Sequence, residues 1–214
     1  MPKSRSEIPV ATVSRLALYL RELQQLQRGA TVHVRSQSLA ERLGLKDSQV
    51  RRDLSCLGPV GQRGVGYPVA DLIVAIEHVL GTDRAWNVIL VGAGNLGRAL
   101  SGYKGFDQQG FRLVAVFDSD PNKIGSKVEE FPVQDLDSLE SFVSNTQIDL
   151  AILAVPASAA RSVASRLEAA GIAGILNFAP IAVHSSGSTT VQDVDLAIEL
   201  QRLAFSVVRS QRPH

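Results

Sequence analysis

The chain has 214 residues, of which 45% are hydrophobic and 20% charged, and its formal net charge is +1. This composition is that of a folded globular protein, and it excludes disordered and collagen-like chains. The single cysteine, Cys56, can form neither an intramolecular disulfide nor, by itself, a zinc site. Because no apolar targeting segment opens the sequence and no stretch approaches the length of a membrane span, we expect a cytoplasmic protein with no membrane partner.

The small net charge conceals two regions of opposite sign. Residues 1–68 hold eleven lysine and arginine side chains against five acidic ones, whereas the remaining residues hold eleven against sixteen. A basic segment joined to an acidic one is typical of a protein in which one domain binds a polyanion and the other does not. Random scatter in composition is the alternative, so the motifs must decide.

Three amphipathic helices are predicted in the basic region. Apolar residues spaced by three and four predict a first helix over residues 12–27, with Thr12 as its N-cap. A second helix is predicted over residues 37–43, with Ser36 as its N-cap, and a third over residues 47–57. Two helices joined by a turn that contains glycine form a helix-turn-helix.

The exposed face of the third predicted helix carries side chains of the kinds that read DNA. Arginine can bond guanine O6 and N7 together, glutamine can bond adenine N6 and N7, and serine or arginine can hold phosphates. We therefore expect this helix to enter the major groove of double-stranded DNA. The expected contacts are Ser48, Gln49, Arg51 and Arg52. A solvated helix face without a ligand is the alternative.

Residues 58–67 have a glycine at every second or third position around Arg63, which favours a β-hairpin. A hairpin directly after a recognition helix is the wing of a winged helix, so Arg63 at its tip is predicted to enter the minor groove. An ordinary loop charge is the alternative. Residues 69–80 predict a further helix, ended by Gly81, that closes the domain.

A glycine-rich turn between a strand and a helix predicts a dinucleotide site. The predicted strand 87–91 is followed by a GxGxxG segment and a helix over residues 98–103, and a second strand, 111–117, ends at Asp118. The segment consists of Gly92, Ala93, Gly94, Asn95, Leu96 and Gly97. Its first glycine permits the tight turn, the second lets the backbone approach a pyrophosphate, and the third allows close helix packing. An incidental glycine turn is the alternative.

Asp118 lies where a dinucleotide-binding fold holds the adenosine ribose. A carboxylate at this place accepts hydrogen bonds from the ribose diol and repels a 2′-phosphate. The phosphates of the ligand would meet the positive end of the helix that follows the glycines. The sequence therefore favours NAD(H) over NADP(H).

The strands and helices that follow continue the alternation of a doubly wound parallel sheet. They are predicted at residues 136–144 (helix), 149–155 (strand), 157–170 (helix) and 172–177 (strand). The strands are rich in Ile, Leu and Val, as parallel strands buried on both faces are. Val155 and Pro156, at the end of a strand, are predicted to line the ligand crevice, although a proline there can equally be an ordinary strand terminator. The fold class is therefore α/β, a winged helix-turn-helix followed by a Rossmann domain.

The last predicted helix, residues 193–208, has apolar side chains around much of its circumference. Such a helix packs against another element, and a second subunit is one candidate. Nothing in the sequence decides between packing within the chain and packing on a partner. The predicted divisions are a winged-helix domain (1–81), a Rossmann domain (82–190) and a C-terminal dimerisation helix (191–214).

The predicted cofactor site lacks the groups of a dehydrogenase. Such an enzyme needs a proton-transfer group beside the nicotinamide. His184 is the only histidine expected near the crevice, and a loop residue without a chemical role is the stronger interpretation. Tyr103 and Lys104 are adjacent, so they point in different directions, and no metal-ligand spacing occurs. We predict a protein that is not an enzyme and binds no metal.

Together these motifs resemble those of the Rex family of bacterial redox-sensing transcriptional repressors. The resemblance runs over nearly the whole chain, and its most specific segments are QVRRDL at 49–54, RGVGY at 63–67, GAGNLG at 92–97 and GILNFAP at 174–180. It implies a homodimer with a swapped C-terminal helix that binds palindromic operator DNA. It also implies release of the operator when NADH binds, so that gene expression follows the NADH/NAD⁺ ratio.

The resemblance implies roles for further residues. Lys123 would lie close to the adenine end of the cofactor, and Leu196 close to the nicotinamide, where some family members have Phe. Three residues, Arg21, Tyr103 and Asp195, would together form a switch between the ligand states. Tyr103 would also belong to the cofactor site. Cys56 and Leu57 stand where the family usually has aromatic residues before the wing, which leaves the packing between helix and wing open.

Two other functions remain open at this point. A winged-helix regulator could sense a different nucleotide, such as NADP(H), and an NAD-dependent oxidoreductase could carry a fused interaction domain. Competition between NADPH and NADH separates the first from an NADH sensor, and a response of operator binding to NADH argues against the second.

Overall fold

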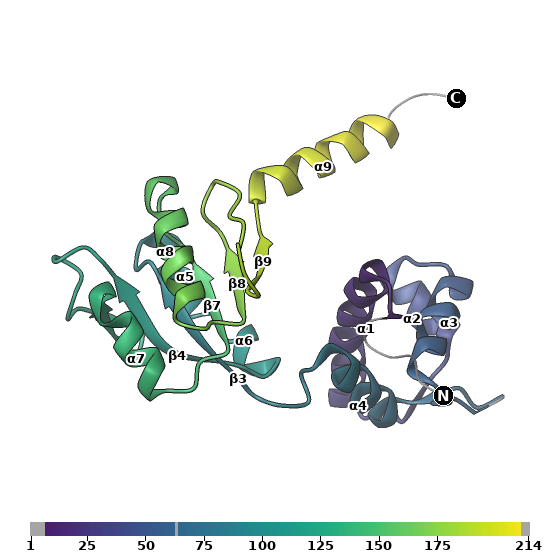
Figure 1. The fold of residues 1–214 in the computed structure, drawn as a ribbon. Coiled ribbons are helices and arrows are strands. Elements are labelled where there is room, and N and C mark those ends of the chain that lie inside the picture. The colour runs from purple at the N-terminus through teal and green to yellow at the C-terminus, as the bar shows by residue number, and fades with distance from the viewer. Residues whose placement is uncertain (1–6, 63, 211–214) are drawn as a thin grey trace. The chain divides into compact units, whose positions relative to one another are not determined.

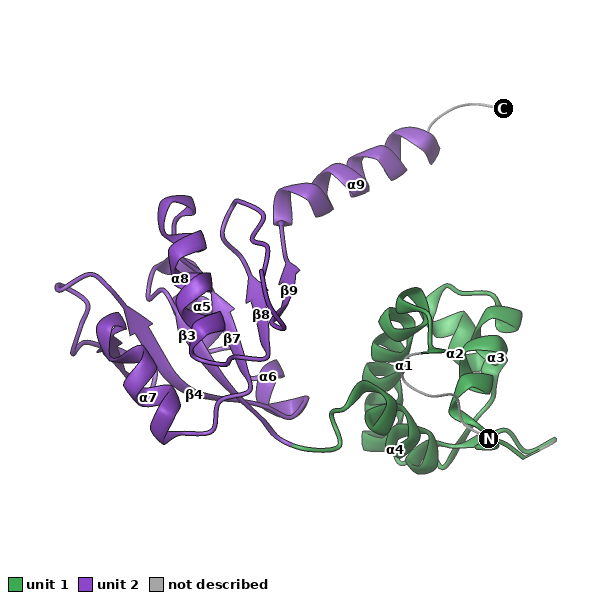
Figure 2. Ribbon diagram, in the orientation of Figure 1, with its two compact units in different colours: residues 1–84 green, residues 85–214 purple. Residues whose placement is uncertain are grey.

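The computed structural model describes residues 7–62 and 64–210 (Figure 1). The chain divides into two compact units, residues 1–84 and 85–214, which are called unit 1 and unit 2 below (Figure 2). Within the described ranges, no helix is both long enough and apolar enough to cross a membrane.

Unit 1 is a small helical unit with a two-stranded sheet. Its elements are α1 (Val10–Arg28), β1 (His33–Val34), α2 (Ser36–Leu43), α3 (Asp47–Leu54), a 3₁₀ turn (Ser55–Leu57), β2 (Tyr67–Pro68) and α4 (Val69–Leu80). The helices bury their apolar faces against one another, with Leu16, Leu39 and Leu72 fully inside. The predicted helix spacing therefore corresponds to one shared core.

Three helix boundaries in unit 1 differ from those predicted. Ser36 is not the N-cap of α2 but its first residue, and Arg35 is the N-cap. Thr12 is not an N-cap, because α1 begins at Val10, where the carbonyl of Pro9 accepts the N–H groups of Thr12 and Val13. The third predicted helix ends as an α-helix at Leu54 and continues as a 3₁₀ turn. Gly58 then ends this turn with a φ of 86°, which L-residues rarely adopt.

The predicted hairpin is short. The backbones of Gln62 and Gly66 exchange hydrogen bonds of 2.8 and 3.0 Å, and Gly64 and Gly66 have positive φ. Beyond this turn, β2 pairs antiparallel with the earlier strand β1. Arg63, the predicted tip residue, lies outside the described residues.

Unit 2 is built on a seven-stranded sheet in the order β5-β6-β4-β3-β7-β8-β9. Its elements are β3 (Trp86–Val91), α5 (Asn95–Ser101), α6 (Gly105–Gln108), β4 (Phe111–Asp118), β5 (Lys127–Val128), β6 (Phe131–Asp135), a 3₁₀ turn (Leu136–Ser138), α7 (Leu139–Asn145), β7 (Leu150–Leu153), α8 (Ala157–Ala169), β8 (Gly174–Asn177), β9 (Thr190–Asp193) and α9 (Leu196–Ser210). The neighbouring strands run parallel except β5 and β6.

Alternate residues of the central strands supply the two faces of this sheet. Ile89 and Leu153 belong to the core under α7 and α8, whereas Val88 and Ile152 belong to the core that α5 and α6 contact. Because β4 lies on one side of β3 and β7 on the other, the chain reverses direction across the sheet at β3. Parallel sheets bind ligands at the carboxyl ends of the strands beside such a reversal.

Strands β5, β6 and β9 were not among the predicted elements. Strand β9 pairs parallel with β8 at the sheet edge and ends at Asp193, the first residue of the predicted last helix, and α9 begins at Leu196. Every described residue of α9 is exposed, and the helix extends away from the sheet (Figure 1).

Candidate dinucleotide site and DNA-reading surface

The glycine-rich turn follows β3 at the carboxyl edge of the sheet, and the protein itself requires two of its three glycines. Gly92 has φ of 106°, and a Cβ there would overlap the carbonyl oxygen of Ala154. A Cβ on Gly97 would overlap the carbonyl oxygen of Gly92, so the absence of a side chain lets α5 approach the turn. These two glycines therefore have the roles that the motif predicts.

Gly94 differs from both neighbours. Its φ is −76°, which any L-residue can adopt, and a Cβ there would meet nothing within 4 Å. The fold thus tolerates a side chain at this position, so the protein's own packing does not call for glycine. Asn95 and Leu96, which begin α5, are exposed beside it. This open space is where the motif places a pyrophosphate.

Asp118 ends β4 next to the glycine turn and is only 8% exposed. Its Oδ2 accepts the N–H of Ala93 at 2.7 Å and the Nζ of Lys123 at 3.0 Å, while its Oδ1 accepts the N–H of Asp120 at 2.8 Å. Burial alone would raise the pKa of Asp118, but these hydrogen bonds hold it below its usual value. Asp118 is therefore an anion at neutral pH.

A carboxylate can accept about four hydrogen bonds, and three of those on Asp118 are taken. Its Oδ1, with one donor, has room for a ribose hydroxyl. Lys123 pairs directly with Asp118 and lies 3.8 Å from Asp120, so its observed partners are carboxylates. No local sequence pattern indicates that Asp118 also fixes the glycine turn through the N–H of Ala93.

Val155 and Pro156 follow β7 at the same edge of the sheet. A Cβ on Gly92 would come within 3.2 Å of Val155, which shows that the two loops touch. Pro156 is the N-cap of α8. The structure thus brings Val155 to the glycine turn, while the observed role of Pro156 is to start a helix. His184 is an exposed loop residue.

Two of the three residues assigned to the switch have other partners in this structure. Tyr103 is 59% exposed, and its ring packs edge to face on Phe106 at 5.0 Å. Asp195 caps α9, because its Oδ1 accepts the N–H groups of Ala197 and Ile198 at 2.8 and 3.2 Å. Within the described part of unit 2, no hydrogen bond joins Asp195 to Tyr103. Arg21 is exposed on α1 in unit 1.

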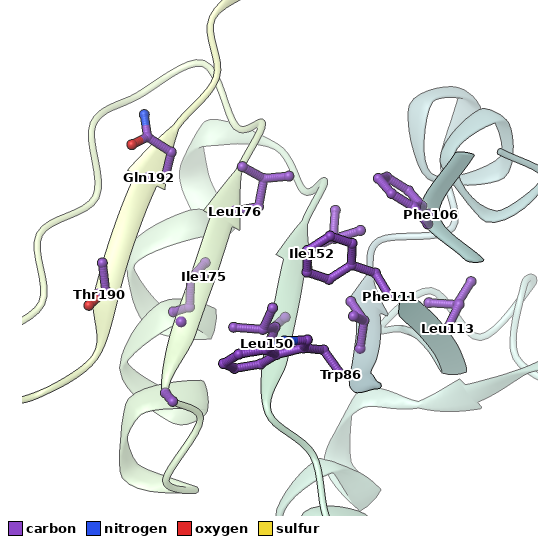
Figure 3. A pocket seen from close by; sticks show the side chains of 14 residues that line it. Trp86, Phe106, Phe111, Leu113, Leu150, Ile152, Ile175, Leu176, Thr190 and Gln192 are labelled. Atoms are coloured by element: carbon purple, nitrogen blue, oxygen red, sulfur yellow. The ribbon is translucent and has the colours of Figure 1, made fainter. Parts of the chain in front are cut away.

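An apolar cavity of about 470 Å³ lies on the face of the sheet of unit 2. Strands β3, β4, β7, β8 and β9 and helix α6 supply its walls (Figure 3). Its large side chains include Trp86, Phe106, Phe111, Leu150, Ile152 and Leu176. The exposed helix α9 is the second apolar surface of this unit, and Leu196 on it is 63% exposed. The apolar surface of this helix was predicted from the sequence, whereas the cavity was not.

Helix α3 presents most of the predicted DNA-reading side chains to solvent. Ser48, Arg51 and Arg52 are exposed, and the guanidinium of Arg51 pairs with the carboxylate of Asp47 at 2.8 Å. Gln49 is half-buried, and its Nε2 donates to the buried Asp53 at 2.9 Å. A groove of about 840 Å³ runs between α2, α3 and the turn of the hairpin.

The residues between α3 and the hairpin pack without aromatic side chains. Cys56 and Leu57 are both buried, each with 6% exposure, and Leu57 belongs to the core of unit 1. The departure from the family pattern at these positions therefore leaves the helix anchored to the core.

The architecture defines a class of protein: a basic helix-turn-helix unit joined to a parallel-sheet unit with a dinucleotide-type glycine turn. A family model described as "CoA binding domain" matches residues 83–181, and one described as "Putative DNA-binding protein N-terminus" matches residues 7–55. The first model covers most of the sheet unit, and the second lies within the helical unit.

The chain is 44% identical to the redox-sensing transcriptional repressor Rex of Carboxydothermus hydrogenoformans, over 95% of this chain and 98% of that protein. Crystal structures of RSP, a Rex-family repressor, are also similar. The complex with β-NAD⁺ and operator DNA has a TM-score of 0.88 at 34% identity, covering 95% of this chain and 94% of that one. The complex with β-NADH has a TM-score of 0.84 at 32% identity, covering 98% and 97%.

This chain therefore belongs to the Rex family of redox-sensing transcriptional repressors. The predicted fold class, a DNA-binding unit followed by a Rossmann-type unit, is confirmed. Since the matched relatives are repressors, the expectation that the chain is not an enzyme is confirmed as well.

Proposed function

We propose that this chain is a repressor that binds operator DNA as a homodimer and releases it when NADH binds unit 2. The observation that carries the proposal is the open backbone at Gly94 beside the anionic Asp118, in a chain whose helix α3 exposes Ser48, Arg51 and Arg52. The crystal structures of the RSP repressor with NADH, and with NAD⁺ and operator DNA, support the same two ligands for this chain. We place the protein in the cytoplasm, because both ligands are present there.

The cofactor assignment rests on Asp118. A buried carboxylate that stays ionised repels the 2′-phosphate of NADP(H), and one free acceptor position on Oδ1 suits a ribose hydroxyl. The residues proposed to hold the dinucleotide are Gly92, Ala93, Gly94, Asn95, Leu96, Gly97, Tyr103, Asp118, Lys123, Val155 and Pro156. NAD⁺ competes for the same site, so the ratio of the two forms sets the occupancy by NADH.

The preference for NADH follows from charge. The dihydronicotinamide ring is neutral and the oxidised ring is cationic, and burying an unpaired charge is costly. We assign Leu196 to the nicotinamide end and Arg21, Tyr103 and Asp195 to the switch between the two ligand states. A 100-fold change in operator affinity requires about 2.7 kcal/mol of coupling, and operator must weaken NADH binding by the same factor.

The homodimer is inferred from apolar surface. A helix with apolar side chains on several sides is buried in its functional form. Leu196, Leu200, Leu203 and Val207 form a stripe on α9, all of them exposed, and the sheet of the same unit carries an apolar cavity. A second copy that covers α9 buries this stripe and brings two α3 helices to a palindromic operator.

Titration of a labelled palindromic operator tests the function as a whole. Operator bound to the protein should be released by NADH, to a smaller extent by NAD⁺, and least by NADPH. Fluorescence anisotropy at fixed salt measures the affinities, since salt alone changes them strongly. An equal response to NADH and NAD⁺ would contradict redox sensing, and a stronger response to NADPH would favour the NADP(H) regulator.

Replacing Arg52 by Ala should weaken operator binding by roughly 10- to 100-fold, because a bidentate contact with a base contributes about 1–3 kcal/mol. Arg52 is the better target than Arg51, which pairs with Asp47. The affinity for NADH, measured by calorimetry, should not change. Arg28→Ala, an exposed arginine on α1, is the matched control. Equal losses in both variants would mean that only overall charge matters.

Replacing Asp118 by Asn should lower NADH affinity about tenfold and reduce the discrimination against NADPH. The amide keeps the size of the side chain but loses the negative charge and the ion pair with Lys123. Asp120→Asn removes a neighbouring carboxylate and should leave nucleotide selectivity unchanged. Calorimetric titrations with both nucleotides measure the effect, and unchanged selectivity in Asp118→Asn would remove its assigned role.

A further inference from the structure

A buried carboxylate joins helix α3 to helix α1. Asp53 of α3 is 1% exposed. Arg15 donates to it through Nε at 2.6 Å and Nη2 at 2.8 Å, and the hydroxyl of Tyr19 donates at 2.8 Å. The hydroxyl of Thr12 donates at 3.2 Å and the Nε2 of Gln49 at 2.9 Å. Three side chains of α1 and one of α3 thus donate hydrogen bonds to a single carboxylate.

Asp53 acts only as an acceptor in this cluster. Burial would raise the pKa of Asp53, but the hydrogen bonds from Arg15, Tyr19 and Gln49 hold it below its usual value. Burial and the neighbouring Asp53 raise the pKa of Tyr19, which therefore keeps its proton and donates it. The carboxylate is ionised and surrounded by donors at neutral pH.

This environment fixes the amide of Gln49. A carboxamide has an NH₂ end that donates and an oxygen end that accepts. Because ionised Asp53 cannot donate, only the NH₂ end of Gln49 can face it. The amide oxygen and the second N–H remain for an outside partner, and an adenine base needs one acceptor for its N6 and one donor for its N7. A glutamine free in solvent would present the two ends at random.

We propose that Asp53 is a positioning residue for base recognition: it holds the Gln49 amide in the one orientation that matches adenine, and Arg15 and Tyr19 hold Asp53 itself. The proposal rests on the proposed function, in which α3 reads operator DNA. It adds the base that Gln49 selects and the buried side chains of α1 that set this selectivity.

The test compares operator variants in which each base pair is substituted in turn. Gln49→Ala should lose about tenfold discrimination at the position where Gln49 contacts adenine. Asp53→Asn should lose discrimination at that same position, because an asparagine can face either end of the amide. In the Gln49→Ala background, Asp53→Asn should cause no further loss there. Tyr19→Phe removes one of the donors that hold Asp53, and it should lower the discrimination at that position by less than Asp53→Asn does, because Arg15 still holds the carboxylate.

A merely structural role of Asp53 gives a different pattern. Asp53→Asn would then weaken binding to all operators equally, and this outcome overturns the proposal, as does a Gln49→Ala variant with unchanged discrimination at every position. If Asp53→Asn does not fold, the side-chain amide of Gln49 is followed by NMR in the wild-type protein, where it should be rigid, and a mobile amide overturns the proposal. Absence of operator binding by the wild-type protein would instead refute the proposed function.

Discussion

A glutamate at Leu203 of α9 should convert the protein to monomers and weaken operator binding at least about 100-fold. Leu203 lies in the exposed stripe with Leu200 and Val207, and a charge there cannot be buried against a second copy without a large cost. Linked half-sites gain between about 100- and 10,000-fold in affinity over single ones, and a monomer loses that gain. Analytical ultracentrifugation and operator titration measure the two effects.

Ser206→Glu is the matched control for this variant. Ser206 lies on the polar side of α9, where Glu199 pairs with Arg202 at 2.6 Å. The same charge on that side should leave the dimer and its operator affinity intact. A Leu203→Glu protein that remains dimeric would show that the stripe is not the subunit interface, whatever its effect on DNA binding.

Replacing Gly94 by Ala should lower NADH affinity by more than about tenfold while leaving the fold unchanged. A Cβ at this position meets nothing within 4 Å, and an L-residue can adopt its φ. The surrounding structure therefore does not have to move to accommodate the methyl group. The methyl group would occupy the space through which a pyrophosphate approaches the backbone. Operator binding should persist and become insensitive to NADH. Thermal unfolding measures the stability of the variant, and calorimetric titration measures its affinity for NADH.

Gly97→Ala should give the opposite pattern. Its Cβ would overlap the carbonyl oxygen of Gly92, so the turn and α5 must move apart and unit 2 loses stability. We expect a lower unfolding temperature together with weaker NADH binding. Normal NADH affinity in Gly94→Ala would show that the open space beside the turn is not the pyrophosphate site.

Local patterns predicted most of the fold. The spacing of apolar residues located α1, α3 and α4 to within a few residues, because each helix buries one face against a shared core. The glycine motif and the Asp118 that follows it were recognisable because backbone geometry demands glycine at two of the three positions. The roles of these residues toward a ligand stay predictions.

The parts that were missed depend on contacts between distant residues. Strand β9 carries mostly polar side chains, and only its pairing with β8 at the edge of the sheet makes it a strand. The local sequence predicts Thr12 as a helix cap, whereas its hydroxyl donates to Asp53, 41 residues away, a contact that has no local signature. The hydrogen bond from the Gln49 amide to Asp53 likewise has no signature in the sequence. The helical pattern alone therefore predicts Gln49 as a fully exposed side chain.

Because α9 is exposed in a single copy, the concentration of the protein also affects how much NADH is needed to release the operator. If operator is bound only by dimers, its occupancy at low protein levels rises with the square of the monomer concentration, and the stability of each copy depends on that concentration too. A cell that makes more of this protein would then need more NADH to clear the same operator. Expression level would thereby adjust the redox threshold without any change in the cofactor site.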